Sequence, residues 1–480
     1  MPLRGALMTR GVKRLSELDT LFYKAESRSQ RFHVLATLLL DRSAIASGGG
    51  YELFQTRVEE RFKLIEPLRQ RAVWSSWGRH PMWIDDPDIN VRQHMHPVVL
   101  PEGGGLDALA ALAGDIASYP LARDKPPWEA WFVDGFEKDQ MAVVAKVHHS
   151  AVDGVSGIFA LAAFFDLEPF PESSDQGPYQ VPDHPTVGRL VAAELSGLQS
   201  RPRAVLAGAG RVLSSAVTLA RTHGPTTPLP CSGPRLSYNR ALTPRRSVGL
   251  TTLSMKDIKD LGEASSASVN DVVVALCTGV LRRYAIQRDE LPDRPLVAAV
   301  PVSERTPEHG AAGNRLSFMF YGLPVHLADP SARLAFVQRS AHDAKEIYRR
   351  GGKGLLGAIA ALCPTAVIGP VMEGLAATHA ANVLPPVANV LISTIRGPEL
   401  PLYVAGAGLS AIFPMGPLME GVGLGITAVS YNDEMSFGFI TCPDLIGEVG
   451  DFSTALHLEL ADLLEAFPVA PRRKPRVKAR

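Results

Sequence analysis

The sequence of 480 residues has few cysteines, and no two of them form a C-x-x-C pair. The four cysteines lie at positions 231, 277, 363 and 442. Small secreted domains depend on dense disulfides, and zinc ribbons depend on paired cysteines. The cysteine content therefore argues against both classes and favours a reducing compartment.

The sequence also has no excess of charge of either sign. Lysine and arginine together number 49, as do aspartate and glutamate, so the formal net charge is zero. A dedicated nucleic-acid-binding protein needs a basic face that replaces phosphate counterions, so no nucleic-acid partner is expected. Hydrophobic residues make up 46% of the chain and charged residues 20%, which predicts a substantial buried core rather than wholesale disorder.

No apolar run is continuous enough to predict a transmembrane helix. Met1–Arg14 lacks the apolar stretch of a signal peptide. Gly354–Met372 contains no charged residue and approaches the roughly 18 residues that span a bilayer, but two glycines and two prolines interrupt it. Because proline disrupts a helix interior, we expect a broken helical segment here, either buried or in contact with a membrane.

Several common catalytic motifs are missing as well. The sequence has no P-loop, no G-x-S-x-G elbow and no H-E-x-x-H motif. His94 and His96 have the spacing of metal ligands, but no carboxylate or thiol partner is evident, so no metal site is predicted. Gly406–Ala411 fits G-x-G-x-x-A, yet nothing downstream completes a dinucleotide-binding unit, and we predict a glycine-rich turn there.

The chain is long for one hydrophobic core, and its apolar runs predict two α/β halves. In the first half, residues 1–168, His33–Leu40 has the composition of a buried strand and Leu106–Ser118 has helical spacing. The runs Glu129–Phe136 and Met141–Val147 flank turn residues, and they predict a hairpin.

Residues 169–245 are predicted to form a proline-rich linker, a helical segment over 186–222 and a crossover to the second half, residues 246–467. The first helix of the second half is expected at Val269–Gln287, with Ser268 as its N-cap. Further strands are expected at Leu296–Val302, Leu316–Leu323, Val387–Ile395, Leu424–Ser430 and Met435–Thr441, and further helices at Asp153–Phe165, Ser331–Arg349 and Asp451–Phe467.

Two adjacent histidines, His148 and His149, follow the strand Met141–Val147 and precede a glycine turn and an apolar run. A histidine at a strand end can project into a cleft, and an imidazole with a pKa of roughly 6.5 can accept a hydroxyl proton at neutral pH. The alternative is that the pair merely ends the strand. Asp153, four residues after His149, either pairs with the histidine ring or caps the following helix.

His148–Gly154 has the pattern H-H-x-x-x-D-G, which is the signature of the superfamily that contains chloramphenicol acetyltransferase, plant alcohol acyltransferases and peptide-synthetase condensation domains. Within it, the chain resembles the bacterial wax ester synthase/acyl-CoA:diacylglycerol acyltransferases almost end to end. Ala122, Pro127 and Thr394 depart from the family pattern. The further blocks that carry the resemblance, in family order, are Arg14–Phe22, Pro120–Glu129, Ser268–Asp271, Val300–Arg305, Gly313–Phe320, Asn389–Pro398, and Ser430–Tyr431 with Ser436–Gly438.

The resemblance implies an α/β (α+β) fold of two chloramphenicol-acetyltransferase-like halves, with mixed sheets and an active-site tunnel at their interface. It implies direct acyl transfer to an alcohol with His149 as the general base and with acyl-CoA as co-substrate, without a metal or other cofactor. Asn270 and Ser393 are candidate oxyanion donors, and helix capping is an equal alternative for Asn270. The residues expected to be structural at the site are His148, Asp153, Gly154 and Arg305, with Arg305 as the partner of Asp153.

The leading hypothesis is an O-acyltransferase that makes triacylglycerol from diacylglycerol, and also wax esters from long-chain alcohols. Two alternatives stay open: a condensation-type enzyme that takes its acyl group from a carrier protein, and a non-catalytic lipid-binding relative. A cytoplasmic location is expected, with peripheral contact to the inner membrane surface or to lipid droplets. Residues 468–480 carry six lysines and arginines; we expect a disordered tail, or alternatively a contact with an anionic membrane surface.

Overall fold

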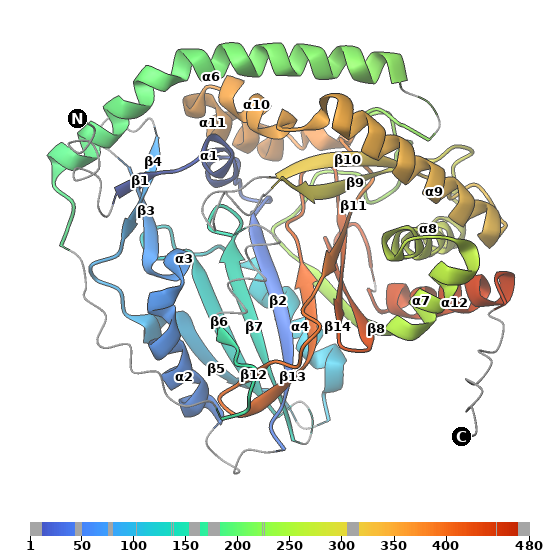
Figure 1. Ribbon diagram of the computed structural model, residues 1–480, viewed down its shortest axis with the longest axis horizontal. Coiled ribbons are helices and arrows are strands. Elements are labelled where there is room, and N and C mark those ends of the chain that lie inside the picture. The colour runs from blue at the N-terminus through green and yellow to red at the C-terminus, as the bar shows by residue number, and fades with distance from the viewer. Residues whose placement is uncertain are drawn as a thin grey trace, which may run out of the picture.

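In the part of the chain that the structure describes, the strands form two six-stranded sheets and a small three-stranded sheet. The computed structural model describes residues 12–43, 50–74, 80–101, 103–135, 137, 139–152, 164–170, 183–222, 224, 226–304, 316–447 and 449–468. Both large sheets contain parallel and antiparallel pairs, so the predicted α/β fold of two halves with mixed sheets is confirmed. Figure 1 shows the halves side by side, with the first in blue and cyan.

The first sheet is built around β2 and β7. Its strand order is β12-β13-β2-β7-β6-β5, and β6 and β7 form the predicted antiparallel hairpin. The strand predicted at His33–Leu40 and the helix predicted at Leu106–Ser118 are also confirmed. The elements of this half are β1 (Val12–Arg14), α1 (Glu17–Lys24), β2 (His33–Asp41), α2 (Gly50–Arg61), α3 (Glu66–Arg69), β3 (Gln70–Trp74), β4 (Pro81–Asp85), β5 (Met95–Val99), α4 (Gly105–Ser118), β6 (Trp128–Asp134) and β7 (Gln140–His148).

Two strands of the first sheet come from the second half of the sequence. β12 (Tyr403–Val404) and β13 (Ala407–Met415) form a hairpin, and β13 pairs antiparallel with β2. The glycine-rich turn predicted over Gly406–Ala411 is therefore wrong in extent. Only Ala405 and Gly406 have positive φ, as a two-residue hairpin turn requires, and the chain then continues as a strand. This crossover ties the two halves together.

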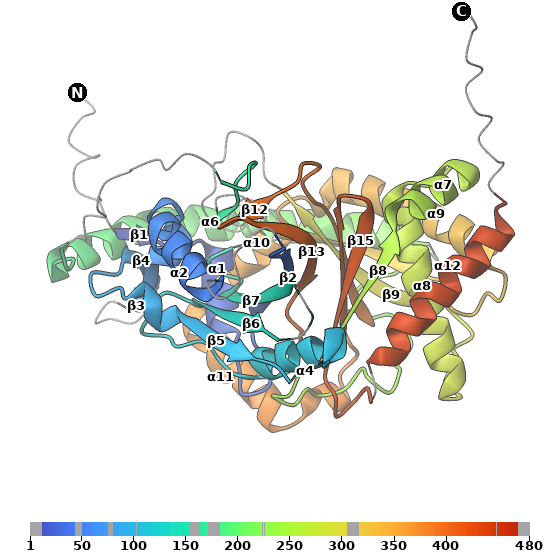
Figure 2. The ribbon, with the colours of Figure 1, turned by 90° about the horizontal axis from the view of Figure 1, so that it is seen from below.

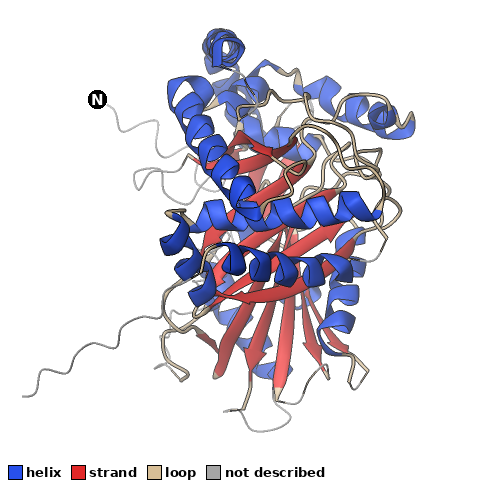
Figure 3. Cartoon of the chain, turned by 90° about the vertical axis from the view of Figure 1, so that its right-hand side faces the viewer, coloured by secondary structure: helices blue, strands red, loops and turns tan. Residues whose placement is uncertain are grey.

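The second sheet has the strand order β10-β9-β11-β14-β15-β8. Seen from the right-hand side of Figure 1, several helices lie in front of its strands (Figure 3). Each strand and helix predicted for this half is present within a few residues of its expected bounds. The elements are β8 (Ser247–Ser254), α7 (Met255–Ser265), α8 (Val269–Gln287), β9 (Leu296–Ser303), β10 (Leu316–Leu323), α9 (Pro330–Ile347), α10 (Leu355–Leu362), α11 (Thr365–Ala377), β11 (Val390–Arg396), β14 (Leu424–Tyr431), β15 (Glu434–Thr441) and α12 (Gly450–Ala466).

The helix α8 is the centre of the second core, and its bounds are those predicted. The Asp271 amide donates to Ser268 Oγ over 3.2 Å, and the Ser268 amide donates to Asp271 Oδ2 over 3.0 Å. This reciprocal capping box satisfies two amides that would otherwise have no partner in the helix. The apolar side chains of α8 pack against the second sheet and against α12.

A single long helix, α6 (Val187–Thr222), runs along the outside of the molecule (Figure 1), where the spacing predicts a helix over 186–222. Viewed from below, it lies beyond α10, which it contacts (Figure 2). Ser215 Oγ on α6 donates a hydrogen bond of 2.5 Å to the Gly351 carbonyl. The predicted helix at Asp153–Phe165 and the linker at 169–185 lie largely outside the described residues, as does the basic tail.

The uncharged stretch Gly354–Met372 forms a broken pair of helices, as its prolines predict. α10 and α11 meet at an angle of 99°, and Pro364 stands at the N-cap of α11. Pro370 was also expected to interrupt the helix, but it lies inside α11. Within the described part of the chain, no single helix has both the length and the apolar character needed to cross a membrane.

Candidate active site

His149 lies just past the end of β7, beside the start of β2. In the register of these antiparallel strands His148 lies opposite His33, and the His149 amide donates a hydrogen bond of 2.6 Å to the Phe32 carbonyl. The His149 side chain is partly exposed. Its ring centroid lies 4.9 Å from that of Phe22. The imidazole is thus held at a strand end against an aromatic wall, with part of its surface still accessible.

His148 points the other way, into the interior, where its side chain is 4% exposed. Its Nδ1 accepts a hydrogen bond of 3.1 Å from the Ser150 amide and lies 2.7 Å from Ser150 Oγ. Its ring centroid lies 5.1 Å from that of Tyr23. His148 is thus buried against the turn that follows it, and its structural role stays a prediction.

The carboxylate of Glu26, which was not among the site residues predicted from the sequence, lies beside His33 and His148. Glu26 Oε1 is 3.4 Å from Nε2 of both His33 and His148, and Glu26 Oε2 is 2.9 Å from Arg123 Nη2. Burial by itself would raise the pKa of Glu26, but the hydrogen bond and charge of His148, with His33 and Arg123, lower it to about 2. The only sign of this contact in the sequence was that Glu26 lies in the segment leading into β2, a buried strand whose first residue is His33.

Other ionisable groups are buried on the same two strands. Burial lowers the pKa of His33 well below its usual value, against the opposing effect of Glu26, so His33 is neutral at pH 7. Lys146 on β7 is 1% exposed, and its Nζ lies 3.4 Å from Glu129 and donates to the Ile116 carbonyl over 3.1 Å. Burial also lowers the pKa of Lys146. The floor of the site, formed by His33, His148, Lys146 and Glu26, is therefore polar and buried.

The opposite wall is apolar and comes from both halves. Phe22 and Phe32 stack with ring centroids 5.1 Å apart, and Phe22 also contacts His149. Elements of the second half close this cluster: Leu316 of β10, Leu356 of α10, Cys363, and Ile368 and Met372 of α11. The broken helix pair thus covers the apolar side of the site, where an acyl chain would need to be excluded from water.

The structure separates the two candidate oxyanion donors. Side chains alternate along β11: Ile392 packs in the core around α8, whereas Ile395 packs against the core of the first half. Ser393 shares the face of Ile395 and is turned toward the half that carries His149. Asn270 instead bonds to the phenol of Tyr321 in the core around α8. The two residues therefore lie on opposite sides of the second sheet, and an oxyanion role stays a prediction for both.

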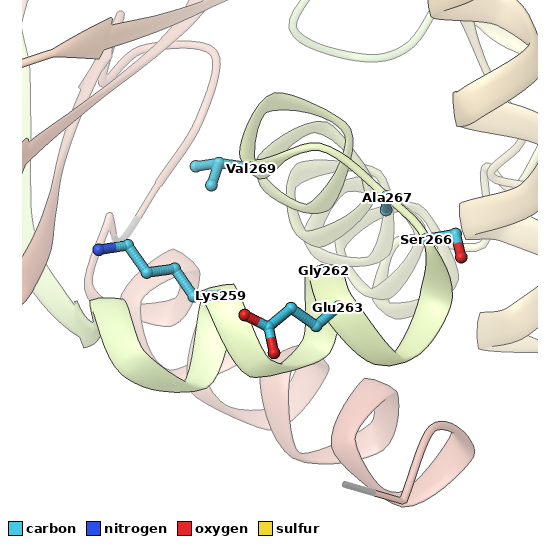
Figure 4. A pocket seen from close by; sticks show the side chains of 6 residues that line it. All are labelled: Lys259, Gly262, Glu263, Ser266, Ala267 and Val269. Atoms are coloured by element: carbon cyan, nitrogen blue, oxygen red, sulfur yellow. The ribbon is translucent and has the colours of Figure 1, made fainter.

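Three predicted site residues, Asp153, Gly154 and Arg305, lie outside the described residues, so their pairing stays a prediction. A cavity of about 270 Å³ lies between α7 and α8. Figure 4 shows Lys259 and Glu263 on its α7 side and Val269 at the start of α8. None of the predicted site residues lines it. The tunnel between the halves is still a prediction.

Comparison with known proteins adds family relationships to this geometry. Residues 15–273 match the family described as the wax ester synthase/diacylglycerol acyltransferase catalytic domain, and residues 312–463 match its C-terminal domain. Two proteins of Mycobacterium tuberculosis, whose names assign them as diacylglycerol O-acyltransferases, are 34% and 31% identical to the chain. They cover 96% and 95% of this chain, and 92% and 96% of their own length.

One solved structure gives the same relationship, and a second shows the fold. The wax ester synthase/diacylglycerol acyltransferase from Marinobacter aquaeolei VT8 superposes with a TM-score of 0.68 at 26% identity, over 95% of this chain and 99% of its own. The starter condensation domain of rhizomide synthetase superposes with a TM-score of 0.57 at 13% identity, over 97% of each chain. The second likeness shows a shared fold alone.

Proposed function

This chain belongs to the wax ester synthase/diacylglycerol acyltransferase family and is an acyltransferase, and we propose that it moves a long-chain acyl group from acyl-CoA to diacylglycerol and to long-chain alcohols. We also propose that His149 is the general base. The observation that supports this most is the partly exposed imidazole at the end of β7, placed between a polar floor in the first half and an apolar wall shared by both halves.

In the proposed reaction, the His149 imidazole takes the hydroxyl proton of the acceptor while the hydroxyl oxygen attacks the thioester carbonyl carbon. The carbonyl oxygen becomes an oxyanion, for which Ser393 is the favoured side-chain donor because it faces the first half. Collapse of the tetrahedral intermediate breaks the carbon–sulfur bond. The imidazolium then returns its proton to the CoA thiolate, so an ester and free CoA leave without an acyl-enzyme intermediate.

Release of CoA thiol from palmitoyl-CoA tests this function directly. Diacylglycerol and hexadecanol are supplied as separate acceptors, and the ester product is identified by mass spectrometry. Release that depends on an acceptor supports the proposal, and the ratio of the two rates identifies the preferred acceptor. Absence of release with both acceptors contradicts it. In that case, transfer from an acylated carrier protein would indicate the condensation-type alternative, and acyl-CoA binding without transfer the non-catalytic one.

We further propose that the enzyme meets a lipid surface through α11. The exposed residues of this helix are Ala366, Val367, Pro370, Val371, Gly374 and Ala377, and the one charged residue of the helix, Glu373, has a side chain 42% exposed and paired with Arg28. Val367 and Val371 are 48% and 53% exposed, whereas Ile368 on the opposite side packs in the cluster of Phe22. Arg349 and Arg350, just before α10, have side chains more than half exposed and share one carboxylate, that of Glu346; the positive charge that remains would attract anionic headgroups. An acceptor would therefore reach the site from the lipid side of α11.

Sedimentation with vesicles of phosphatidylcholine and phosphatidylglycerol tests this surface. The double variant Val367→Asp/Val371→Asp is expected to lose most vesicle binding, because two charges would enter the lipid interface. Leu458→Asp, at a half-exposed leucine on α12, is the matched control and keeps binding. The long helix α6 exposes Leu206 and Leu213. If Leu206→Asp/Leu213→Asp releases the protein while the α11 variant does not, the docking surface is α6 and the α11 proposal is wrong.

A further inference from the structure

Glu26 contacts both segments that hold the backbone of His149. It lies in the loop between α1 and β2, and its side chain is 7% exposed. Oε1 accepts a hydrogen bond of 3.1 Å from the Phe32 amide and lies 3.4 Å from His148 Nε2. Phe32 in turn accepts the hydrogen bond from the His149 amide. The carboxylate therefore reaches His149 from one side through Phe32 and from the other through His148.

The contacts of His148 also determine its tautomer. Because Nδ1 accepts a hydrogen bond from the Ser150 amide, the proton of a neutral His148 ring must be on Nε2, the nitrogen that faces Glu26. The Ala151 amide donates to the His148 carbonyl over 2.9 Å. His148 thus organises the turn on both sides of residue 149, and the carboxylate oxygen of Glu26 that faces its Nε2 lies 3.4 Å away.

The loop that carries Glu26 is braced independently against the second half. The Glu420 amide donates to Gln30 Oε1 over 2.8 Å, and Ser29 Oγ donates to Glu420 Oε1 over 2.5 Å. Arg246 donates to the Ser29 carbonyl. Since none of these bonds uses the Glu26 side chain, a substitution at Glu26 removes the contacts to His148 and Phe32 without freeing the whole loop.

We infer that Glu26 is a positioning residue for acyl transfer, which holds the turn of His149 in its productive geometry through His148 and through the Phe32 amide. The inference rests on the proposed role of His149 as general base. A purely structural role would predict a loss of folded protein with a normal turnover per folded molecule. A positioning role predicts a lower kcat in a protein that still folds and still binds acyl-CoA.

Substitution of Glu26 separates these outcomes. Glu26→Ala is expected to lower kcat by about 10²-fold with an unchanged KM for palmitoyl-CoA, as for a misplaced reacting group. Glu26→Gln keeps an acceptor oxygen for His148 and Phe32, and it should retain most of kcat. Glu17→Ala is the matched control, because Glu17 is likewise a glutamate beside a buried histidine, with its Oε2 3.3 Å from His80 Nε2. Wild-type kcat in folded Glu26→Ala, or equal losses in Glu26→Ala and Glu17→Ala, would overturn the inference.

A double-mutant cycle with His148→Asn tests the route. If Glu26 acts largely through His148, adding Glu26→Ala to His148→Asn lowers kcat little further; independent, multiplying losses contradict this route.

Nitrogen-15 NMR of labelled histidines gives a readout that does not depend on any substrate. Wild type should show the Nε2–H tautomer at His148, and Glu26→Ala should change that signal. An Nδ1–H tautomer of His148 in wild type would refute the positioning role of Glu26, even if the protein transfers acyl groups. If the expected tautomer is found but no acyl transfer occurs, only the proposed function is refuted.

Discussion

Each half of the molecule buries a glutamate among cationic or ionisable partners, and the two clusters differ in composition. In the second half, Glu459 is 3% exposed and bonds to Arg333 Nη2 at 2.6 Å and to Arg283 Nε at 2.7 Å. In the first half, Glu26 faces two imidazoles and a single guanidinium. Arginine is always protonated in proteins, so the cluster of Glu459 is a permanent ion pair, whereas imidazoles change charge near neutral pH.

This difference between the clusters indicates which of them can take part in catalysis. Glu459 connects α12 to α8 and α9, and it lies so close to Gly279 that a Cβ at that position would overlap its carboxylate. This cluster holds helices together on the far side of the second sheet. The cluster of Glu26 lies beside the only turn in the chain that carries the H-H-x-x-x-D-G pattern. We therefore expect losses of activity from changes at the first cluster and losses of stability from changes at the second.

The largest effect on activity is expected for His149→Ala. Loss of a general base lowers kcat by roughly 10²–10⁴-fold, while the partly exposed side chain contributes little to folding. His342→Ala, at an exposed histidine on α9, is the control and should turn over normally. Steady-state CoA release and a thermal melt of both variants are the measurements. A His149→Ala protein that folds and retains full kcat would remove the basis for assigning the chemistry to the first cluster.

Glu459→Ala is expected to show the opposite behaviour. Removing one partner leaves Arg333, whose side chain is 4% exposed, as an uncompensated buried charge, which costs about 3–5 kcal/mol of the free energy of unfolding. Glu399→Ala breaks an exposed pair with Arg396 and should leave stability close to that of wild type. Urea unfolding measures both. Activity per folded molecule should stay normal in Glu459→Ala; a fall in kcat would show that the two clusters are not functionally separate.

Ser393→Ala tests how the second half contributes to the site. If Ser393 donates to the oxyanion, its loss lowers kcat by roughly 10²–10³-fold with little change in KM. Asn270→Ala should have little effect on kcat, because Asn270 bonds to Tyr321 in the core around α8. Ser268→Ala, which removes the cap of the same helix, controls for disturbance of the helix start. A large loss of kcat in Asn270→Ala alone would reverse the assignment of the two residues.

The sequence predicted local structure well where local chemistry determines it. The bounds of α8 followed from Ser268 and Asp271, which cap the helix through bonds to neighbouring residues. β13 was missed because its partner β2 is distant in the sequence, and because Gly406 before the strand and Gly408 inside it resemble a glycine-rich turn. The same reasoning applies to the site. His148 and His149 stand in a recognisable pattern, whereas Glu26 becomes informative only when β2 and β7 pair and bring His33 opposite His148.

The smallest predicted effect is a pH dependence of stability that arises in the first cluster. Burial lowers the pKa of His33 well below its usual value, with Glu26 opposing this and His148, Lys146 and Arg31 adding to it. The unfolded chain therefore binds a proton near pH 6.5 that folded His33 does not bind, and the free energy of unfolding falls as pH decreases below 6.5. Burial also lowers the pKa of His94 and the pKa of His326, which is less buried. Glu26, with a pKa of about 2, adds its own loss only below about pH 4.5.

His33→Asn should remove one of the protons that the chain takes up when it unfolds at acidic pH. Between pH 6.5 and 5 the slope of the free energy of unfolding should decrease by about 1 kcal/mol per pH unit relative to wild type. Urea unfolding at several pH values measures both slopes. Equal slopes in wild type and His33→Asn would show that His33 is charged in the folded protein. The cluster of Glu26 would then be a permanent ion pair like that of Glu459, and the contrast between the halves would disappear.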